Sequence, residues 1–595
     1  MHLIKPLLIS LVITLLISCN TEQNSTTSFN SGFKNVTAGS GFDFSNILNE
    51  EVMINPFNYI NVYNGGGAAI GDINNDGLQD VFMTSNMDVS KLFLNQGDMK
   101  FKDITVSAGV NKVGWCTGVT MADVNQDGWL DIYVCRSYYD APQDRANFLY
   151  INNKDNTFTE QGIQYGVADT NYSIGASFFD YDLDGDLDLV VANHPRFRLV
   201  SLQIHYDYWT NPVPEFSNRL FRNDGNKFVD VTEEAGLLAY GFSLSLSTSD
   251  FNNDNYPDIF ITVDHDEPDL VYKNNKDGTF SNIVNEALRS STLSSMGIDA
   301  GDLNNDSYPD LVVAEMLSND HFTEKVNMSM QNVDRFNYMT DTLGYKYYQM
   351  HNFLYSNNGN NTFSDVSQLT GVHKSDWSWA SLFMDYNNDG NQDIFFANGY
   401  YKNIMHRDKR MTLDSIMATL NGDMARMNEA AKRYSINASQ TKVKNVMFTN
   451  HGDLDFENTS DKVGLTEKTI STGSAYGDLD NDGDLDLVVC NIGEPSFVYE
   501  NISGNRNYLR VNLELSSQQP RLGSKISLTA GGKTHYRELL STRGYQSSCE
   551  PIAHFGLGNL KQVDEVTITW PNGKSQVLKN VKSNQTLNVK YVCLL

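Results

Sequence analysis

The chain has 595 residues and a formal net charge of -29, with 73 acidic side chains against 44 basic ones. A surface this acidic argues against nucleic acid as a partner, because phosphate binding needs a basic patch. The length is sufficient for one large repeat domain followed by a smaller one.

The N-terminal segment has the features of an export signal. Lys5 precedes an apolar run at residues 7–17, which is too short to span a bilayer as a stable helix. The sequence Leu-Ile-Ser-Cys, ending at Cys19, matches a bacterial lipobox. We therefore expect residues 1–19 to be a lipoprotein signal peptide and Cys19 to be lipidated; the alternative is an ordinary signal peptide with an incidental cysteine. Residues 20–31 are polar and are predicted to form a flexible tether.

A short acidic motif recurs seven times along the chain. In its clearest copy, Asp180-Tyr-Asp-Leu-Asp-Gly-Asp-Leu-Asp188, oxygen-bearing side chains stand at positions 1, 3, 5 and 9, and glycine stands at position 6. This spacing suits calcium, because a tight loop can then offer several oxygen ligands to one hard cation. We predict about seven Ca²⁺ ions, which would offset roughly half of the negative charge. The predicted ligands are Asp72, Asn74, Asp76, Asp80, Asp123, Asn125, Asp127, Asp131, Asp180, Asp182, Asp184, Asp188, Asp250, Asn252, Asp254, Asp258, Asp302, Asn304, Asp306, Asp310, Asp385, Asn387, Asp389, Asp393, Asp478, Asp480, Asp482 and Asp486.

Position 12 of the motif distinguishes these loops from helical EF-hands. An EF-hand needs a bidentate Glu there, whereas all seven copies carry an apolar residue, from Met83 to Val489. Asn255 and Ser307 replace the glycine at position 6. We expect slightly more backbone strain in these two turns, because residues other than glycine adopt positive φ less readily. Metal-free Asx turns are the alternative, but seven turns have no reason to share four oxygen positions.

The same order of strands surrounds each loop. A strand of small residues precedes the loop and an apolar strand follows it. Next come an aromatic–aliphatic strand ending in Asn, such as residues 91–95, and a short strand such as residues 101–105. These repeats predict an all-β fold, a seven-bladed β-propeller over residues 32–504. The last repeat lacks its fourth strand, and residues 33–37 are predicted to supply it and close the ring.

Three long gaps between loops locate insertions at residues 194–217, 316–350 and 400–443, of which the last reads as helical. If they leave the same face, they would form a raised, aromatic-lined rim. Loops on a rigid scaffold commonly carry function. We therefore predict ligand contacts from Tyr206, Trp209, Tyr345 and Tyr347. The alternative is that the insertions only cover one another.

Residues 505–595 lack the acidic motif and contain alternating strands, which predict a small C-terminal β domain. Five cysteines follow Cys19. Cys116 with Cys135, or Cys549 with Cys593, could form a bridge, but the default expectation is buried, unreactive thiols.

Two sets of residues carry a family resemblance. The acidic repeats resemble the FG-GAP/VCBS repeats of integrin-α-type propellers. The segments Arg543-Gly-Tyr-Gln-Ser-Ser, His554-Phe-Gly-Leu-Gly and Val566-Thr-Ile-Thr-Trp-Pro-Asn-Gly resemble the ASPIC/UnbV domain. Together they are similar to the family that includes cartilage acidic protein 1 and its bacterial relatives. The resemblance implies extracellular binding or adhesion and, with a lipobox, a lipoprotein of the outer membrane or cell surface, sometimes beside nutrient-uptake systems.

Three functions are compatible with these features. The first is a non-catalytic, calcium-stabilised surface protein that binds a glycan, peptide or protein, and the second is an accessory subunit of an outer-membrane transporter. The third is an extracellular glycan hydrolase or lyase, since propellers host catalysis and glycoside cleavage uses carboxylate pairs. The carboxylates that group in the sequence are already assigned to metal loops, and no nucleophile elbow or H-E-x-x-H helix occurs. The sequence therefore favours binding over catalysis.

Overall fold

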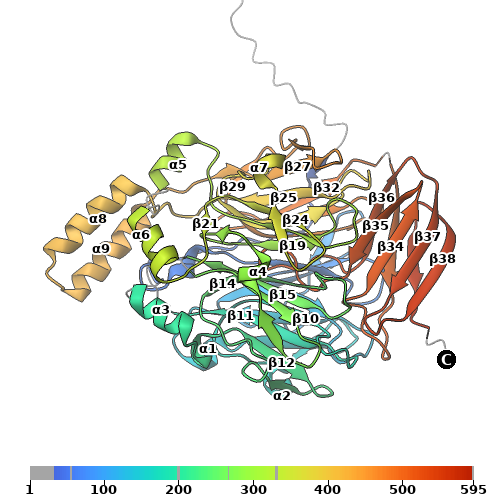
Figure 1. The fold of residues 1–595 in the computed structure, drawn as a ribbon, viewed down its shortest axis with the longest axis horizontal. Helices are drawn as coiled ribbons and strands as arrows, with labels where there is room; N and C mark the ends of the chain where they lie inside the picture. The colour runs from blue at the N-terminus through green and yellow to red at the C-terminus, as the bar shows by residue number, and fades with distance from the viewer. Residues whose placement is uncertain are drawn as a thin grey trace, which may run out of the picture.

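The computed structural model describes residues 32–53, 56–196, 202–265, 267–327, 333–504 and 506–592 (Figure 1). The predicted signal peptide, Cys19 and the tether lie outside these residues. Within them the chain is mostly β, with many four-stranded sheets, and the predicted propeller fold followed by a smaller β domain is confirmed.

Between Phe33 and Asn501 the described residues form seven four-stranded sheets, each built from neighbouring antiparallel strands. The sheets are β2 (Ala68–Gly71), β3 (Asp80–Met83), β4 (Lys91–Asn95), β5 (Phe101–Asp103); β6 (Cys116–Ala122), β7 (Asp131–Arg136), β8 (Phe148–Asn152), β9 (Phe158–Glu160); β10 (Tyr172–Phe179), β11 (Asp188–His194), β12 (Arg219–Asn223), β13 (Phe228–Asp230); β14 (Phe242–Ser249), β15 (Asp258–Asp264), β16 (Leu270–Asn274), β17 (Phe280–Asn282); β19 (Ile298–Gly301), β20 (Asp310–Val313), β22 (Phe353–Asn357), β23 (Phe363–Asp365); β24 (Ser378–Met384), β25 (Asp393–Asn398), β27 (Val446–Asn450), β28 (Phe456–Asn458); and β30 (Ser471–Gly477), β31 (Asp486–Asn491), β32 (Phe497–Asn501) with β1 (Phe33–Asn35).

The ring closes through the N-terminal strand. β1 pairs with β32 in the register Phe33↔Asn501, so the first strand of the chain completes the last sheet, as the sequence predicts. The first strands of the sheets contact one another in the order β2, β6, β10, β14, β19, β24 and β30, and β30 contacts β2 again. This closure pairs the edges that an open array would leave exposed.

Small residues near the innermost strands let neighbouring sheets approach closely. A Cβ on Gly118 would lie 2.4 Å from the carbonyl oxygen of Ile174, and a Cβ on Gly297 would lie 2.4 Å from that of Trp379. Both contacts cross from one sheet to the next. Glycine is therefore required there by close backbone packing.

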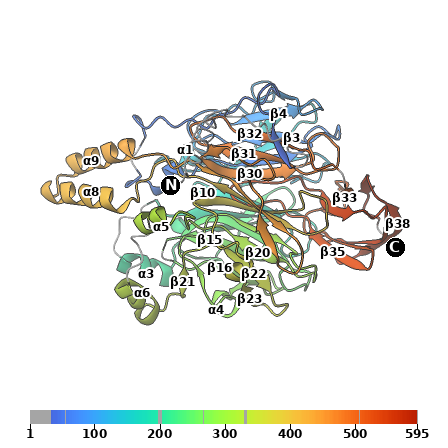
Figure 2. The same ribbon diagram turned by 90° about the horizontal axis from the view of Figure 1, so that it is seen from above.

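The insertions form helices on the side of the propeller away from the C-terminal domain (Figures 1 and 2). They leave between the second and third strands of their sheets, whereas the metal loops join the first and second strands, so the two features lie on opposite faces. Their helices are α3 (Leu202–Thr210), α5 (His321–Asn327), α6 (Val333–Asn337), α8 (Arg407–Thr419) and α9 (Met424–Asn437). The remaining short elements include α1 (Pro142–Arg145), α2 (Gly162–Tyr165), α4 (Val284–Ala287), α7 (Ser367–Thr370) and the two-strand pairs β18 (Ser291–Thr292) with β21 (Tyr348–Gln349) and β26 (Val443–Lys444) with β29 (Lys468–Thr469).

The C-terminal domain consists of two sheets that share one apolar core, which includes Leu509, Phe555 and Trp570. One sheet has the order β35-β34-β37-β38 and the other β36-β33-β39. The strands are β33 (Asn507–Leu513), β34 (Lys525–Ala530), β35 (Lys533–Glu538), β36 (Ala553–Gly558), β37 (Gln562–Thr569), β38 (Ser575–Lys582) and β39 (Thr586–Val589).

The described cysteines are buried free thiols: Cys116, Cys135, Cys490 and Cys549. The possible bridge between Cys116 and Cys135 is therefore not formed, and the expectation of buried thiols is confirmed for these four. Cys593 lies outside the described residues.

Candidate metal centres and the axial plug

The seven acidic loops lie where the first strand of each sheet turns into the second. Position 9 is in every case the first residue of the second strand, from Asp80 in β3 to Asp486 in β31, and its carboxyl group is buried. Position 4 has a left-handed backbone, with φ between 56° and 62° in all seven loops. The chain thereby turns tightly around the predicted ligands.

The loops share one hydrogen-bonding pattern. In each, Oδ2 of the position 1 Asp accepts the backbone N–H of position 6, at N···O distances of 2.5–3.1 Å. Asn255 and Ser307 keep this bond, with φ of 73° and 70°. The two departures from glycine at position 6 therefore preserve the loop geometry.

The Asn that ends the third strand supports each position 9 carboxylate. Its backbone N–H donates to Oδ1 of that Asp at 2.7–2.8 Å in all seven sheets. In five sheets its side-chain amide also donates to a carbonyl in the preceding sheet's loop; Asn95, for example, donates to the carbonyl of Leu479 at 2.7 Å. The Asn that the sequence shows at the end of the third strand thus links adjacent sheets.

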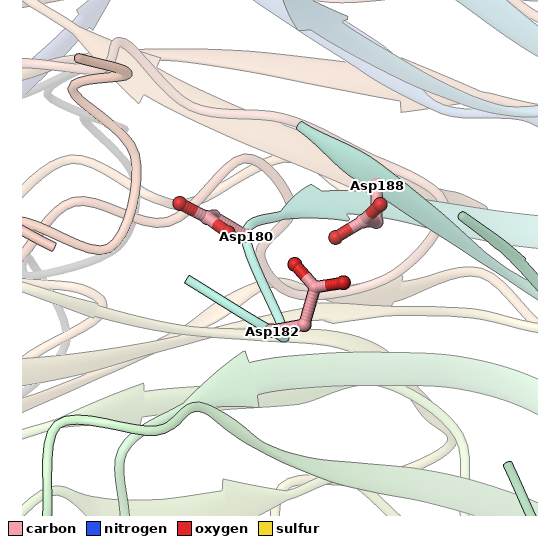
Figure 3. A group of neighbouring side chains, drawn as sticks. All are labelled: Asp180, Asp182 and Asp188. Atoms are coloured by element: carbon pink, nitrogen blue, oxygen red, sulfur yellow. The ribbon is translucent and has the colours of Figure 1, made fainter. Parts of the chain in front are cut away.

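In two loops, three carboxylates converge closely enough to hold a metal ion. The oxygens of Asp180, Asp182 and Asp188 lie within 4.8 Å of one another (Figure 3), as do those of Asp478, Asp480 and Asp486. Oδ1 of Asp180 is buried and has no hydrogen-bond partner among the described residues, so this oxygen is suited to coordinate a cation.

Burial and like charges act together on these carboxyl groups. Burial, with added repulsion from Asp184 and Asp182, raises the pKa of Asp180 to about 7. Burial, with repulsion from Asp482 and Asp478, raises the pKa of Asp480 to about 7. A bound divalent cation would favour the charged form of each group and so relieve both effects.

A second set of loop contacts was not anticipated from the sequence. The amide of Asn75 at position 4 donates to the carbonyl of Gly128 in the next loop at 3.0 Å, and Asn481 donates to Gly77 at 3.0 Å, which joins the last loop to the first. Gln126, Asn253 and Asn388 make equivalent bonds. The sequence signal was present, since position 4 is Asn or Gln in six of the seven loops and Leu183 in the other.

The C-terminal domain covers the metal-loop face with cationic and N–H groups. Nη1 of Arg510 lies 2.9 Å from Oδ2 of Asp478, and Nη1 of Arg506 lies 3.2 Å from Oδ2 of Asp389. Lys525 pairs with Asp250. These contacts offset part of the repulsion among the loops.

Between β35 and β36, residues 539–551 leave the C-terminal domain and occupy the propeller axis. This axial plug contacts the first strand of every sheet. It bonds to Ala68 and Ile70 of β2, Val119 of β6, Ala176 and Phe178 of β10, Ser245 of β14, Ile298 of β19 and Tyr476 of β30. The Tyr545 ring lies 5.3 Å from that of Trp379 in β24.

The plug is held by buried charge as well as by hydrogen bonds. Nη1 of Arg543 lies 2.8 Å from Oδ1 of Asp299 on β19, and both side chains are almost fully buried. Tyr545 and Ser547 are fully buried. The propeller and the C-terminal domain therefore share one interior along the axis, and the sequence marked this segment only as glycine-rich.

The four aromatic side chains predicted to bind a ligand differ in their surroundings. Tyr206, Trp209 and Tyr345 pack against one another, with ring centroids 4.7–6.2 Å apart, and Tyr345 is only 4% exposed. Two insertions thus cover each other here. Tyr347 is 58% exposed on the surface.

One carboxyl group on the insertion side has no side-chain partner among the described residues. Glu315 follows β20 and is fully buried. Burial raises the pKa of Glu315 to about 8. Repulsion from Asp264 also raises this pKa, whereas the backbone N–H of Met316 lowers it. The folded state therefore holds this proton more tightly than the unfolded chain.

Glu315→Gln is expected to change how stability depends on pH. Because the folded pKa is raised, the wild-type contribution is fully present below the unfolded pKa near 4.5 and is lost as pH rises towards about 8. The variant should gain a few kcal/mol relative to wild type at about pH 8 and little near pH 4.5. Denaturant unfolding at both pH values measures this. The exposed Glu233→Gln is the control, and equal pH profiles for wild type and Glu315→Gln would contradict the argument.

Two parts of the chain match known families. Residues 514–592 match the ASPIC and UnbV family, and residues 72–134, 250–313 and 340–396 match the FG-GAP-like repeat. The chain is 30% identical over 271 residues to cartilage acidic protein 1 of Homo sapiens and 28% identical over 267 residues to that of Mus musculus. These alignments cover 40% of this chain and 40% and 41% of the relatives, so the match spans well under half of each relative. Integrin alpha-3 of Cricetulus griseus is 27% identical over 173 residues, which are 28% of this chain and 15% of that protein.

Solved structures show distant likeness in fold. A lectin of Agrocybe aegerita that recognises non-reducing terminal N-acetylglucosamine has a TM-score of 0.33 at 15% identity, covering 75% of this chain and 92% of its own. The Dos1 propeller has a TM-score of 0.33 at 8% identity, with coverages of 74% and 94%.

Within the described residues, no helix combines the length and the apolar character needed to cross a membrane.

Proposed function

Because the chain carries FG-GAP-like repeats and an ASPIC and UnbV domain, and is homologous to cartilage acidic protein 1, we propose that it is a non-catalytic, calcium-stabilised binding protein of the cell surface. The repeats and the integrin-like relative point to an extracellular or surface protein. A lipid on Cys19 would anchor it at the outer membrane. The partner would be a glycan, peptide or protein, for example beside a nutrient-uptake system.

The metal loops support the calcium part of this proposal. All seven share the turn geometry described above, and two bring three carboxylates together. Calcium bound there would stabilise the turn between the first and second strands of each sheet. A weak structural site suffices in an extracellular space that is rich in calcium.

The observation that carries the proposal is that the C-terminal domain and the insertion helices lie on opposite faces of the propeller. This arrangement supports binding by the insertions. The C-terminal domain covers the metal-loop face and fills the axis, whereas the insertion helices project on the opposite side (Figure 2). Met411 on α8 and Met424 on α9 are 60% and 64% exposed, and an apolar groove of about 790 Å³ runs between these helices. Exposed apolar surface of this kind is typical of an interaction site.

The occupation and burial of the carboxyl groups argue against a glycan-active enzyme. Those of the metal loops are occupied by the turn hydrogen bonds and the proposed ions. Glu315 has a pKa in the range of a general acid, but it is fully buried, so a glycan would not reach it. Binding is therefore the better-supported function.

Replacing the exposed methionines of the α8–α9 helical hairpin tests the proposal. In a pull-down from detergent-solubilised membranes in millimolar calcium, Met411→Ser/Met424→Ser is expected to recover at least about tenfold less partner than wild type, because it removes apolar contact area. Val106→Ser, at a residue that is 77% exposed outside the insertions, is the matched control. Equal recovery by both variants would refute binding through the hairpin. Release of reducing sugar from polysaccharides by purified wild type would instead support the enzyme.

A further inference from the structure

A polar cavity of about 550 Å³ lies between the propeller and the C-terminal domain. Its propeller wall includes Asn75 of the first metal loop and Asn481 of the last. Its other wall comes from β33, β39 and the segment around Arg521. The volume is within the range of small-ligand sites, which often lie at domain interfaces.

Most charged groups that line this cavity are already matched. The two oxygens of Asp72 accept backbone N–H groups of its own loop, at 3.2 and 2.9 Å. Glu514 lies 3.2 Å from the Lys590 ammonium. Arg510 pairs with both Asp478 and Glu550. These groups can line a site without contributing a free charge.

Arg521 differs from them. Its Nη1 contacts Asn512 Oδ1 at 3.4 Å and the Leu513 carbonyl at 3.3 Å, and both of these partners are neutral. In the part of the chain that the structure describes, no carboxylate lies within 4.0 Å of it. Asp123, Asp72 and Glu550 attract this charge from farther away. The half-buried guanidinium therefore lines the cavity without a direct ion pair, and a carboxylate is the anion that fits its planar fork.

The neutral lining suits hydroxyl groups. Asn75, Gln79, Asn512, Thr586 and Asn588 contribute amides and a hydroxyl, which can each donate and accept hydrogen bonds. The Asn512 amide donates to Asn588 at 2.9 Å, which fixes the orientation of that pair. A smaller apolar part of the wall comes from Leu515, Pro551 and Ile552.

We propose that this cavity binds a uronic acid, either free or at the end of an oligosaccharide, with its carboxylate on Arg521 and its hydroxyl groups on the surrounding amides. The site lies on the face opposite the insertions, so it goes beyond the proposed function and does not depend on the hairpin. A bidentate Arg–carboxylate pair would set the orientation of the sugar.

Calorimetric titration of the full chain in millimolar calcium tests the site. Galacturonate and a short oligogalacturonide are the ligands, and they distinguish a free acid from a chain end. Galactose tests the need for the carboxylate, and acetate tests the need for the hydroxyl groups. We expect one of the acidic sugars to bind at least about tenfold more tightly than galactose or acetate, since a charge-assisted pair contributes about 1.5–3 kcal/mol.

Variants locate the binding. Arg521→Gln should weaken binding of the acidic sugar at least about tenfold, and Asn588→Leu, on the other side of the cavity, should also weaken it. Lys561→Gln removes the same charge from an exposed position of the same domain and should bind like wild type. The proposal is overturned if neither acidic sugar gives heat, if acetate binds equally well, or if Lys561→Gln and Arg521→Gln weaken binding alike. Asn588→Leu leaves the buried side of the cavity unchanged. If this variant binds the acidic sugar as tightly as wild type does, the proposal is also overturned.

Discussion

Excess EDTA is expected to lower the melting temperature by roughly 10 °C relative to protein in about 10 mM calcium chloride. With dissociation constants of about 10⁻⁴–10⁻³ M, each site would contribute about 1.4–2.7 kcal/mol at that concentration, and seven sites would contribute on the order of 10 kcal/mol. A protein of this size has an unfolding entropy of roughly 1 kcal/mol per kelvin, which converts that energy into the stated shift. Differential scanning calorimetry with and without calcium measures it.

Single-site variants make this experiment specific. Asp182→Ala removes a ligand from the three-carboxylate group of the third loop and should lose only one site's share of the calcium effect. Glu234→Ala, an exposed residue outside the loops, should lose none. An unchanged melting temperature after chelation would refute the calcium assignment. Complete unfolding of Asp182→Ala would show that the loops act as one cooperative unit.

Gly67→Ala is expected to destabilise the protein by about 3 kcal/mol or more, because the axial plug occupies the space that a side chain would need. A Cβ on Gly67 would lie 1.7 Å from the carbonyl oxygen of Gln546, which is backbone and cannot rotate away. Overpacking of a rigid core typically costs about 1–3 kcal/mol, and this overlap is severe. Denaturant unfolding measures the loss. Trypsin cleavage after Arg543, whose side chain is only 11% exposed in the wild-type plug, should become faster.

Gly175→Ala is the matched control. Gly175 lies on β10, another innermost strand, but a Cβ there would meet no heavy atom within 4 Å. Its stability should remain within about 1 kcal/mol of wild type, and its Arg543 should stay protected. Equal effects of the two substitutions would show that the plug does not fill the axis in solution.

The sequence alone determined the local chemistry of the propeller. Oxygen-bearing residues at positions 1, 3, 5 and 9 identified the loops, and strand alternation identified the sheets, because both patterns are set by residues a few positions apart. The missing fourth strand of the last repeat also predicted the pairing of β1 with β32, since an unpaired edge is unfavourable. The Asn at the end of each third strand was visible, but its bonds to two loops required the spatial order of the sheets.

Only the tertiary structure decided what the C-terminal domain does. Arg543 and Tyr545 stand in a segment whose sequence is merely glycine-marked, yet they lie on the propeller axis, more than 160 residues from Trp379 and more than 240 from Asp299. Tyr206, Trp209 and Tyr345, three of the four aromatics predicted to bind a ligand, were likewise placed by packing between two insertions. Contacts of this range depend on how complete elements meet, and local spacing carries no information about that. The sequence therefore specified the loops and sheets, whereas closure of the axis and the cavity beside Arg521 followed from how the two domains pack together.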